Sequence, residues 1–501
     1  MARIAVIGAG MGAMAAAARL AVGGHRVVVY ERAGTYGGAL GRVERDGFAF
    51  DTGPGLLQLP AVFRDLFLKT GKEPLERCVE LSQVEPAVRH VFADGTEVSL
   101  PNASRAGVGE ALDAALGGGA GARWAAFMNR AREAWDRSRR PLLEEPLWPN
   151  WQVLAEREPY PAAVQRRLLR RDRVATTLTE VAELELGGEP RLRALLEHYA
   201  LAYGLDPRTT PPSAAVLPYM EQTFGAWSVR GGLRALADAV YERCLARGVE
   251  FRFGAEVTRI VEKDGRAAGV ELSDRSAEDA AFVVAGVAPG VLDGLLPGPP
   301  VRATGEVPSQ AQGGLPSRLT VLLALRGGRP EDTPYRTVVH AGDRQDELDR
   351  LFGPRPAVAV SPSVTVLRPG DPELVPDAEH EAVTLTVTVP AHAEVSEAEV
   401  ERVLTVAERA VPGLRDRLLW HEVRTPADVA AATGADGGSV PAPALASAGG
   451  RLLHPSNSTR IPGLFAVGGW AHPGGGLPHA GMSGALVAGL IVEGPDFRGS
   501  Q

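Results

Sequence analysis

The chain has 501 residues, of which 45% are hydrophobic and 23% charged, and its formal net charge at pH 7 is −8. This length predicts at least two modules with sizeable cores, and the acidic balance excludes a general basic surface for nucleic acid. Cys78 and Cys244 lie far apart and fit no metal-ligand spacing, so we expect no metal site and a cytoplasmic location. No window reaches the roughly 20 apolar residues of a membrane-spanning helix.

A strand–turn–helix–strand unit opens the chain. The apolar run Arg3–Ile7 predicts a strand, and a glycine-rich turn follows at residues 8–13. The Ala-rich stretch that ends near Val22 predicts a helix. A second strand is expected over His25–Tyr30, and Glu31 ends it.

This unit predicts a dinucleotide-binding site. Gly8 permits the tight turn, Gly10 lets the backbone approach a pyrophosphate, and Ala13 is small enough for the helix to pack on the strand. Free N–H groups at the start of the helix attract phosphate. Glu31 lies at the end of the second strand, where its carboxylate can accept hydrogen bonds from ribose hydroxyls.

Two features favour FAD over NAD. Gly37-Gly38 follows Glu31 closely, as in flavoproteins that wrap the adenosine half of FAD with such a loop. Gly47–Pro54 predicts a strand that ends in a Gly/Pro turn, and such a turn can bring bare backbone beside a flat ring. An ordinary hairpin turn is the alternative for this second feature.

The next part of the chain predicts strands and then helices. Strand-like alternation extends from about Glu80 to Pro101, with a hairpin at Asp94-Gly95. Helical patterns dominate from about Gly107 to Glu197. Within them, Gln165–Arg173 (QRRLLRRDR) holds five arginines around two leucines. This pattern indicates a basic amphipathic patch for anionic lipid or, alternatively, a solvated helix face.

Residues 233–285 are expected to return to the nucleotide-binding sheet. A helix is predicted over Leu233–Arg247, and strands are predicted over Val249–Phe253, Glu256–Ile260, Ala268–Leu272 and Ala281–Ala285. Val257 can offer its backbone N–H and C=O to adenine, although a position in the core explains this residue equally well.

A second sheet with helices is predicted from about Val301 to Ala432. Its expected elements are strands over Ser317–Leu325, Ala357–Val366 and Val383–Val389 and a helix over Val395–Ala410. His340, His380 and His392 are interpreted as structural or solvated, because no charged catalytic constellation accompanies them in the sequence.

The last part of the chain, residues 463–491, is the second stretch that predicts a flavin site. Gly463–Val467 predicts a buried strand, a glycine-rich loop with His472 and His479 follows, and Ser483–Ile491 predicts a helix. N–H groups near the start of that helix can stabilise the negative charge of a reduced flavin. Two histidines without a third ligand do not predict a metal site.

These motifs resemble those of bacterial phytoene desaturase-type enzymes of the flavin amine oxidase superfamily. The resemblance is clearest in Ala5–Leu20, Gly37–Pro54, Ala226–Leu272, Pro455–Asn457 and Ile461–Gly484. It implies an α/β fold, with a three-layer Rossmann-type FAD-binding domain around a parallel sheet and a discontinuous α+β substrate domain with a helical cap. The implied FAD-binding domain covers 1–78, 225–298 and 435–496. The substrate domain covers 79–224 and 299–434, with the cap at about 105–215.

The resemblance also implies roles for residues. Gly8, Gly10, Gly12 and Glu31 would contact FAD phosphate and ribose, Val257 would hold adenine, and Gly53-Pro54 with Leu477-Pro478 would lie by the isoalloxazine. The expected cofactor-contacting residues are Gly8, Ala9, Gly10, Met11, Gly12, Ala13, Glu31, Arg32, Gly38, Ala39, Arg42, Gly53, Pro54, Gly55, Leu56, Val257, Gly468, Gly469, Trp470, Gly476, Leu477, Pro478 and Met482.

Two departures from the family pattern stand out. Tyr36–Ala39 replaces the usual Pro-Gly-Gly-Arg, whose arginine normally lies near the FAD phosphates, and Arg42 is the expected substitute. His479 stands where a glycine is common after Leu-Pro. Its imidazole can reach the flavin edge and alter the chemistry or the substrate.

The expected reaction is hydride transfer to FAD from an unactivated or allylic C–H of a hydrophobic polyene or isoprenoid, as in carotenoid biosynthesis. A neighbouring proton must then leave, and His479 and His472 are the candidate bases because imidazole titrates near neutral pH. Oxygen or a quinone would accept the electrons, and contact with the inner face of the membrane is an open alternative. Rival functions are an amine or natural-product oxidase with a more polar substrate and a prenyl-binding carrier of the Rab escort type.

Overall fold

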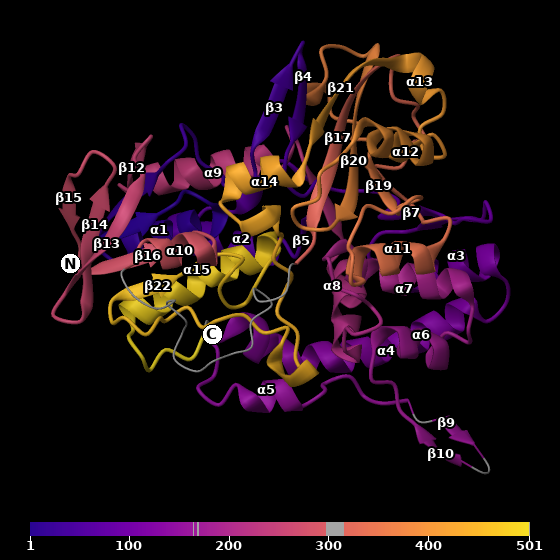
Figure 1. The fold of residues 1–501 in the computed structure, drawn as a ribbon, viewed down its shortest axis with the longest axis horizontal. Helices are drawn as coiled ribbons and strands as arrows, with labels where there is room; N and C mark the ends of the chain where they lie inside the picture. The colour runs from indigo at the N-terminus through magenta and orange to yellow at the C-terminus, as the bar shows by residue number, and fades with distance from the viewer. Residues whose placement is uncertain (164, 168–169, 297–314, 500–501) are drawn as a thin grey trace.

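A five-stranded parallel sheet surrounds β1 (Arg3–Ile7) in the computed structural model, which describes residues 1–163, 165–167, 170–296 and 315–499. The strand order is β12-β2-β1-β16-β22, and every pairing in this order is parallel (Figure 1). The other strands are β2 (Arg26–Glu31), β12 (Glu250–Phe253), β16 (Phe282–Ala285) and β22 (Leu464–Ala466). Three distant parts of the chain therefore build one sheet, and the predicted α/β class is confirmed.

The parallel sheet is the middle one of three layers, with helices on one face and a small antiparallel sheet on the other, and both faces of β1 are therefore buried. Ile4 and Val6 pack among helices, whereas Ala5 and Ile7 pack against a small antiparallel sheet. The helices on the first face are α1 (Met11–Val22), α2 (Ala61–Gly71), α9 (Leu233–Ala246) and α15 (Leu477–Val492). The small sheet has the order β13 (Val257–Lys263), β14 (Arg266–Leu272), β15 (Ala277–Asp279).

Helices α1 and α15 approach each other through glycines. A Cβ atom on Gly484 would lie 2.6 Å from the carbonyl oxygen of Gly12 and 2.8 Å from the Cβ of Ala15. A Cβ atom on Gly12 would lie 2.8 Å from both the Cα of Gly468 and the carbonyl oxygen of Ala480. Because real Cβ atoms do not approach so closely, only glycine fits at these two positions. The C-terminal segment therefore lies directly against the N-terminal turn.

A seven-stranded sheet has the order β21-β17-β20-β19-β18-β7-β8, in which the β18–β7 pairing is parallel and the others are antiparallel. Its strands are β7 (Val88–Val91), β8 (Glu97–Leu100), β17 (Ser317–Arg326), β18 (Arg336–Val339), β19 (Val364–Leu367), β20 (His380–Val389) and β21 (Leu418–Arg424). On one face, Val321 and Leu323 pack against α12 (Glu397–Ala407), and on the other, Leu322 packs against Phe50 of β4 (Phe48–Asp51).

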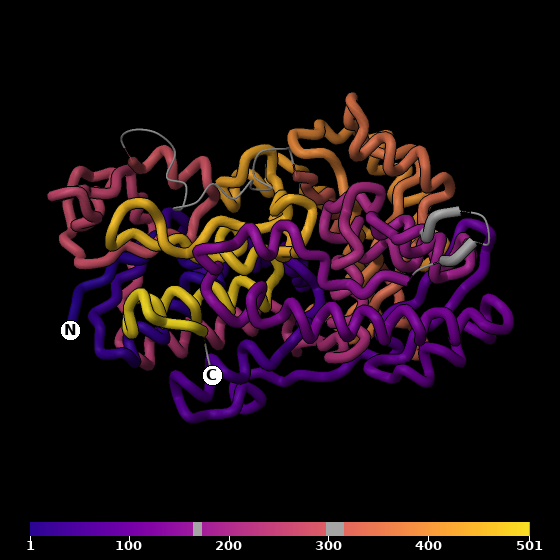
Figure 2. The backbone as a smooth tube through the Cα atoms, turned by 90° about the horizontal axis from the view of Figure 1, so that it is seen from below, coloured from indigo at the N-terminus to yellow at the C-terminus, as the bar shows by residue number. Residues whose placement is uncertain are grey.

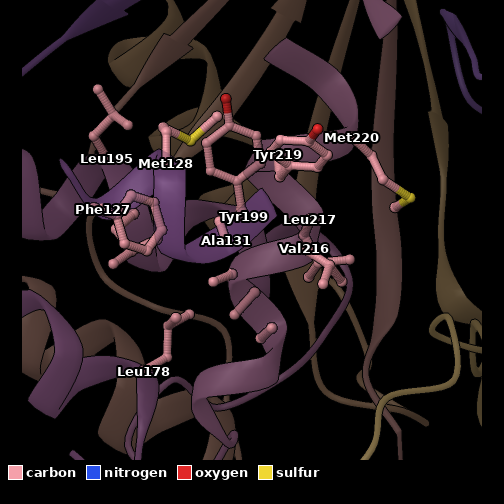
Figure 3. Close-up of a cluster of buried hydrophobic side chains, with 14 of the residues drawn as sticks. Phe127, Met128, Ala131, Leu178, Leu195, Tyr199, Val216, Leu217, Tyr219 and Met220 are labelled. Atoms are coloured by element: carbon pink, nitrogen blue, oxygen red, sulfur yellow. The ribbon is translucent and has the colours of Figure 1, made fainter. Parts of the chain in front are cut away.

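Helices between residues 105 and 224 form the cap, whose apolar core contains Phe127, Met128, Leu195 and Tyr199 (Figure 3). The cap elements are α3 (Arg105–Leu116), α4 (Ala120–Arg139), the π-helix η2 (Arg140–Glu144), α5 (Gln152–Glu156), α6 (Leu178–Glu185), α7 (Pro190–Ala202), η3 (Pro212–Ala215) and α8 (Val216–Phe224). Figures 1 and 2 show that most of the cap and the seven-stranded sheet lie together, at the end of the molecule away from the N-terminus.

Short elements connect these parts. The strands are β3 (Arg42–Arg45), β5 (Leu57–Gln58), β6 (Leu81–Gln83) and β11 (Ala226–Val229), and the helices and 3-10 turns are η1 (Leu75–Arg77), α10 (Pro289–Gly294), α11 (Arg344–Phe352), η5 (Pro372–Leu374), α13 (Leu414–Arg417), α14 (Pro426–Thr433), η6 (Asp436–Gly438) and η7 (Ala448–Gly450).

Two sequence predictions were wrong. In its described residues the arginine-rich stretch is not helical: they form the antiparallel strands β9 (Gln165–Arg167) and β10 (Arg170–Arg173), and residues 168–169 lie outside the described part of the chain. Its two leucines are adjacent and do not repeat at helical spacing, and neighbouring arginines on one helix face would repel each other. The strand predicted from Ala357 begins only at Val364, after one proline (Pro362) and the two serines that flank it.

Among the described residues, the longest and most apolar helices still fall short of what a membrane-crossing helix requires.

We expect Gly484→Ala to lower the free energy of unfolding by about 1–3 kcal/mol, because the added methyl group must push α1 and α15 apart. Urea denaturation of the apoprotein measures this change. Gly290→Ala is the matched control, since a Cβ atom there meets no described atom within 4 Å. Equal unfolding free energies for the two variants would contradict the close crossing.

Candidate active site

The first turn is held in place by its own backbone and by Glu31. Gly8 has a φ of +88°, and its N–H donates to the carbonyl oxygen of Tyr30 at 2.8 Å. The carboxylate of Glu31 accepts the N–H of Ala9 at 2.7 Å and the N–H of Ala33 at 2.8 Å. Glu31 therefore fixes the turn and still presents carboxylate lone pairs at the end of β2.

The turn leaves an open cradle for an anion. A Cβ atom on Gly10 would meet no described atom within 4 Å. Gly10 is also the N-cap of α1, and Gly476 is the N-cap of α15, and neither helix has a side-chain cap or an acidic residue in its first turn among the described residues. Uncapped helix starts carry free N–H groups and partial positive charge. This donor set fits the pyrophosphate of a dinucleotide.

Arg234 of α9 is the cation that lies on the Tyr36–Ala39 loop. Its guanidinium donates to the carbonyl oxygen of Tyr36 at 2.7 Å and to the hydroxyl of Thr35 at 3.0 Å. Arg42, the expected substitute for the missing arginine, lies beside Glu44, with Nε 3.2 Å from the carboxylate, and its role near the FAD phosphates stays a prediction. Nothing in the sequence singles out Arg234, because it is separated from Tyr36 by 198 residues.

The turn at Gly53–Leu56 packs closely on this same loop. A Cβ atom on Gly53 would lie 2.8 Å from the carbonyl oxygen of Ala39, so the two segments touch through backbone. The hydroxyl of Tyr335 donates to the carbonyl oxygen of Gly55 at 3.2 Å. The Gly53–Leu56 turn is therefore held against the Tyr36–Ala39 loop, and its place beside a flavin ring stays a prediction.

A buried polar cluster shapes the C-terminal glycine-rich loop. The side-chain amide nitrogen of Asn457 lies 2.8 Å from the carbonyl oxygen of His472 and 3.0 Å from the hydroxyl oxygen of Ser483. That hydroxyl also accepts the N–H of Gly468 at 3.0 Å. Asn457 thus joins the end of β22, the loop and α15. The sequence marked Asn457 as part of a family motif but suggested no role for it.

The remaining expected residues are distributed around this framework. Met11 and Ala13 are buried along α1, and Leu477 packs against the helical layer of the parallel sheet. Gly469 and Trp470 follow β22 and are partly buried. Val257 is buried where β13 meets the parallel sheet, and Arg32 donates to the carbonyl oxygen of Ala431 at 2.8 Å.

His472 is completely buried and bonded to the cap. Its Nε2 lies 2.9 Å from the carbonyl oxygen of Glu145, so Nε2 carries the proton and Nδ1 does not. Burial lowers the pKa of His472 to about 4, although the bond to Glu145 opposes this shift. The expectation of a pKa near neutrality is therefore not met, and the proposed role of His472 as a base stays a prediction.

His479 lies in a pocket between the cap and α15. The pocket is lined mainly by apolar side chains, among them Val216, Leu217 and Met220, which Figure 3 shows as sticks. Its other lining residues are Trp135, Ser138, Arg139, Leu142, Leu143, Pro443, Ala444, Leu445 and His479. Burial, followed by the nearby His454 and His472, lowers the pKa of His479 to about 3. The imidazole is therefore neutral at pH 7.

These features fit a dinucleotide-binding enzyme with a largely apolar pocket beside its C-terminal glycine-rich loop. A family model described as "Flavin containing amine oxidoreductase" matches residues 14–492. The chain belongs to this family of FAD-dependent oxidoreductases, FAD is its cofactor, and the resemblance to its bacterial carotenoid desaturase-type members is confirmed.

Full-length relatives support this assignment. The chain is 30% identical to 4,4'-diapolycopene oxygenase of Methylomonas sp, with 98% of each chain covered. It is 29% identical to the zeta-carotene-forming phytoene desaturase of Myxococcus xanthus, with 97% of this chain and 93% of that one covered. It is 28% identical to hydroxyneurosporene desaturase of Rubrivivax gelatinosus, with 98% and 93% covered.

Solved structures share the fold. An oxidoreductase from Methanosarcina mazei superposes with a TM-score of 0.63 at 18% identity, covering 97% of this chain and 99% of that one. A putrescine oxidase bound to putrescine superposes with a TM-score of 0.62 at 12% identity, covering 98% and 99%. At these identities the similarity establishes the fold alone.

We expect Arg234→Gln to weaken FAD binding about tenfold, because the Tyr36–Ala39 loop loses the cation that donates to its carbonyl oxygens. Titration of apoprotein with FAD measures the dissociation constant. Arg247→Gln, an exposed change just beyond the end of α9, is the control. Unchanged affinity in Arg234→Gln would show that this cation does not support the FAD site.

The buried histidines should make the fold sensitive to acid. The folded pKa values of His454, His472 and His479 lie below the ordinary value of 6.5, so the unfolded chain binds more protons below about pH 6.5. The free energy of unfolding should therefore fall as pH drops from about 6.5 towards 4, by up to about 1.4 kcal/mol per pH unit for each histidine. Urea denaturation at several pH values measures this slope.

His472→Gln should reduce the pH dependence of the unfolding free energy by the contribution of one histidine, up to about 1.4 kcal/mol per pH unit. His392→Gln changes an exposed side chain and should leave this pH dependence unchanged. If His472→Gln keeps the wild-type slope, then His472 is not held neutral in the folded protein.

Proposed function

We propose that this enzyme is a desaturase that removes hydride from a long, largely apolar polyene or isoprenoid. The observation that carries the proposal is the pocket that the cap side chains Leu142, Leu143 and Val216 line together with His479 of the first turn of α15. The relatives named as carotenoid desaturases support the same substrate class.

The cap supplies the apolar lining through a local distortion. Residues Arg140–Glu144 continue α4 as a π-helix, with Pro141 at its start. Such bulges are frequent at functional sites. Here the bulge directs the adjacent Leu142 and Leu143 to one pocket. Apolar walls exclude water and bind a polyene by burying its surface.

The composition of the pocket argues against an amine substrate. Among the described residues that line it, none is acidic, and Arg139 would repel a protonated amine. Enzymes that bind cationic amines need a carboxylate or an aromatic cage at that point. A prenyl-binding carrier is disfavoured because the chain belongs to a family of flavin-containing oxidoreductases.

For the cofactor, we propose that the expected residues of the three segments form one FAD site, and that the domain boundaries follow those segments. Free N–H groups at the start of α1 would bind the phosphates, and Glu31 would accept from ribose. Bound FAD supplies the two-electron acceptor. The backbone at Gly53-Pro54 and Leu477-Pro478 would flank its ring system, and Val257 would lie by adenine.

The protein must also accept a proton from the substrate carbon next to the one that loses hydride. Such a proton is strongly acidic, so a weak base suffices. His479 lines the pocket and fits this role better than His472, whose Nε2 is bonded to the carbonyl oxygen of Glu145. We further propose oxygen or a quinone as electron acceptor, and contact with the cytoplasmic membrane face for the delivery of a lipid-soluble substrate.

Anaerobic mixing of the holoenzyme with polyenes and with polyamines tests the proposal. We expect a polyene to bleach the visible absorbance of the oxidised flavin and a polyamine to leave it unchanged. Val216→Phe, which fills part of the pocket, should slow bleaching about tenfold at unchanged FAD content. Leu419→Phe, an exposed change on β21, should leave the rate as it is. Bleaching by an amine alone would refute the proposal.

A further inference from the structure

His479 is a polar side chain in an otherwise apolar part of the pocket. Its exposed fraction is 7%, and its Nδ1 has no hydrogen-bond partner among the described residues. The other histidines of this loop region have partners: His454 Nε2 lies 2.7 Å from the carbonyl oxygen of Ala442, and His472 Nε2 lies 2.9 Å from that of Glu145. His472 Nδ1 also has no hydrogen-bond partner among the described residues, but of these two rings only His479 is among the described residues that line the pocket.

Space is available next to the free nitrogen. A Cβ atom added to Gly476 would lie 3.3 Å from His479 Nδ1. Apart from the residues next to Gly476 in the chain, no other described atom would lie within 4 Å of that Cβ. A side chain at residue 476 would fill this space, and glycine leaves it empty. Glycine at residue 476 therefore supplies no side chain that could hydrogen bond to Nδ1.

A pure hydrocarbon would fit this pocket poorly at one point. When an apolar chain fills the pocket and expels water, the imidazole loses any water partner and gains none in return. A buried polar group without a partner destabilises the complex. A ligand that carries an oxygen at this position avoids that loss.

The charge state of the pocket favours a neutral oxygen. His479 is uncharged at pH 7, so one ring nitrogen donates and the other accepts. Ser138 Oγ donates to the carbonyl oxygen of Ala134 at 2.7 Å and keeps lone pairs to accept a further bond. Arg139 lies 3.8 Å from the carboxylate of Glu144 and is largely exposed. A hydroxyl or a carbonyl suits His479 and Ser138, whereas the cation Arg139 is largely exposed and already paired with Glu144.

We propose that His479 is a specificity-determining residue that hydrogen bonds to a hydroxyl or carbonyl oxygen on an otherwise apolar polyene. This inference rests on the proposed function and narrows it to oxygen-bearing substrates. His479 belongs to the first turn of α15, next to the glycine-rich loop. Its hydrogen bond to the substrate oxygen therefore fixes which carbons of the polyene lie closest to that loop. This hydrogen bond determines the position of the polyene along the pocket, because apolar contacts alone allow several positions.

Binding without turnover tests the proposal. The holoenzyme is kept reduced, so that no hydride can be taken, and quenching of tryptophan emission reports polyene binding, since Trp135 lines the pocket. The probes are three polyenes of equal length that end in a hydrocarbon, a hydroxyl or an aldehyde. We expect wild type to bind at least one oxygenated probe about tenfold more tightly than the hydrocarbon.

His479→Leu should abolish this preference by weakening the oxygenated probe and strengthening the hydrocarbon. His479→Gln, which keeps a donor and an acceptor, should restore part of it. His421→Leu, an exposed change on β21, is the matched control and should keep the wild-type preference. The flavin absorbance of each ligand-free, oxidised variant is compared with that of wild type.

If all three probes bind and His479→Leu keeps the wild-type preference, the inference is wrong and the proposed function stands. An altered flavin spectrum in ligand-free His479→Leu, with equal binding of the three probes to wild type, would also overturn it, because His479 would then serve the cofactor. If no polyene binds to wild type, the proposed function fails together with the inference.

Discussion

The close crossing of α1 and α15 is the constraint on which the rest of the structure depends. Gly12 and Gly484 remove the side chains that would keep these helices apart, and the carbonyl oxygen of Ala480 and the Cα of Gly468 then lie against the first turn of the chain. Two uncapped helix starts thereby share one edge of the parallel sheet. A dinucleotide site made from the two ends of a 501-residue chain requires this proximity.

The same crossing orients the pocket that we propose for the substrate. Asn457 and Ser483 hold the loop that precedes α15, and His472 bonds this loop to the cap through the carbonyl oxygen of Glu145. The first turn of α15 consequently lies where the apolar cap side chains meet the glycine-rich loop. The apolar side chains of the cap can bind a hydrophobic substrate, and the N–H groups at the helix starts can bind the charged groups of FAD. Oxidation of a hydrophobic substrate by a flavin needs both environments.

Much of this architecture could be predicted from the sequence because its signals are local. The strands β1 and β2 are uninterrupted apolar runs, and the turn at Gly8 needs a glycine because its φ is +88°. Arg234 could not be found, since its contact with the Tyr36 carbonyl joins segments almost 200 residues apart. The depressed pKa values of His472 and His479 were also out of reach, because burial by the cap causes them and the sequence does not display that burial.

A single-turnover product analysis tests the central claim most directly. The oxidised holoenzyme is mixed anaerobically with a polyene, and the product is measured by mass spectrometry against the amount of flavin reduced. The account predicts a product lighter by two hydrogen atoms, with one product molecule for each reduced flavin. Flavin reduction without any change in the mass of the polyene, or reduction by amines alone, would contradict it.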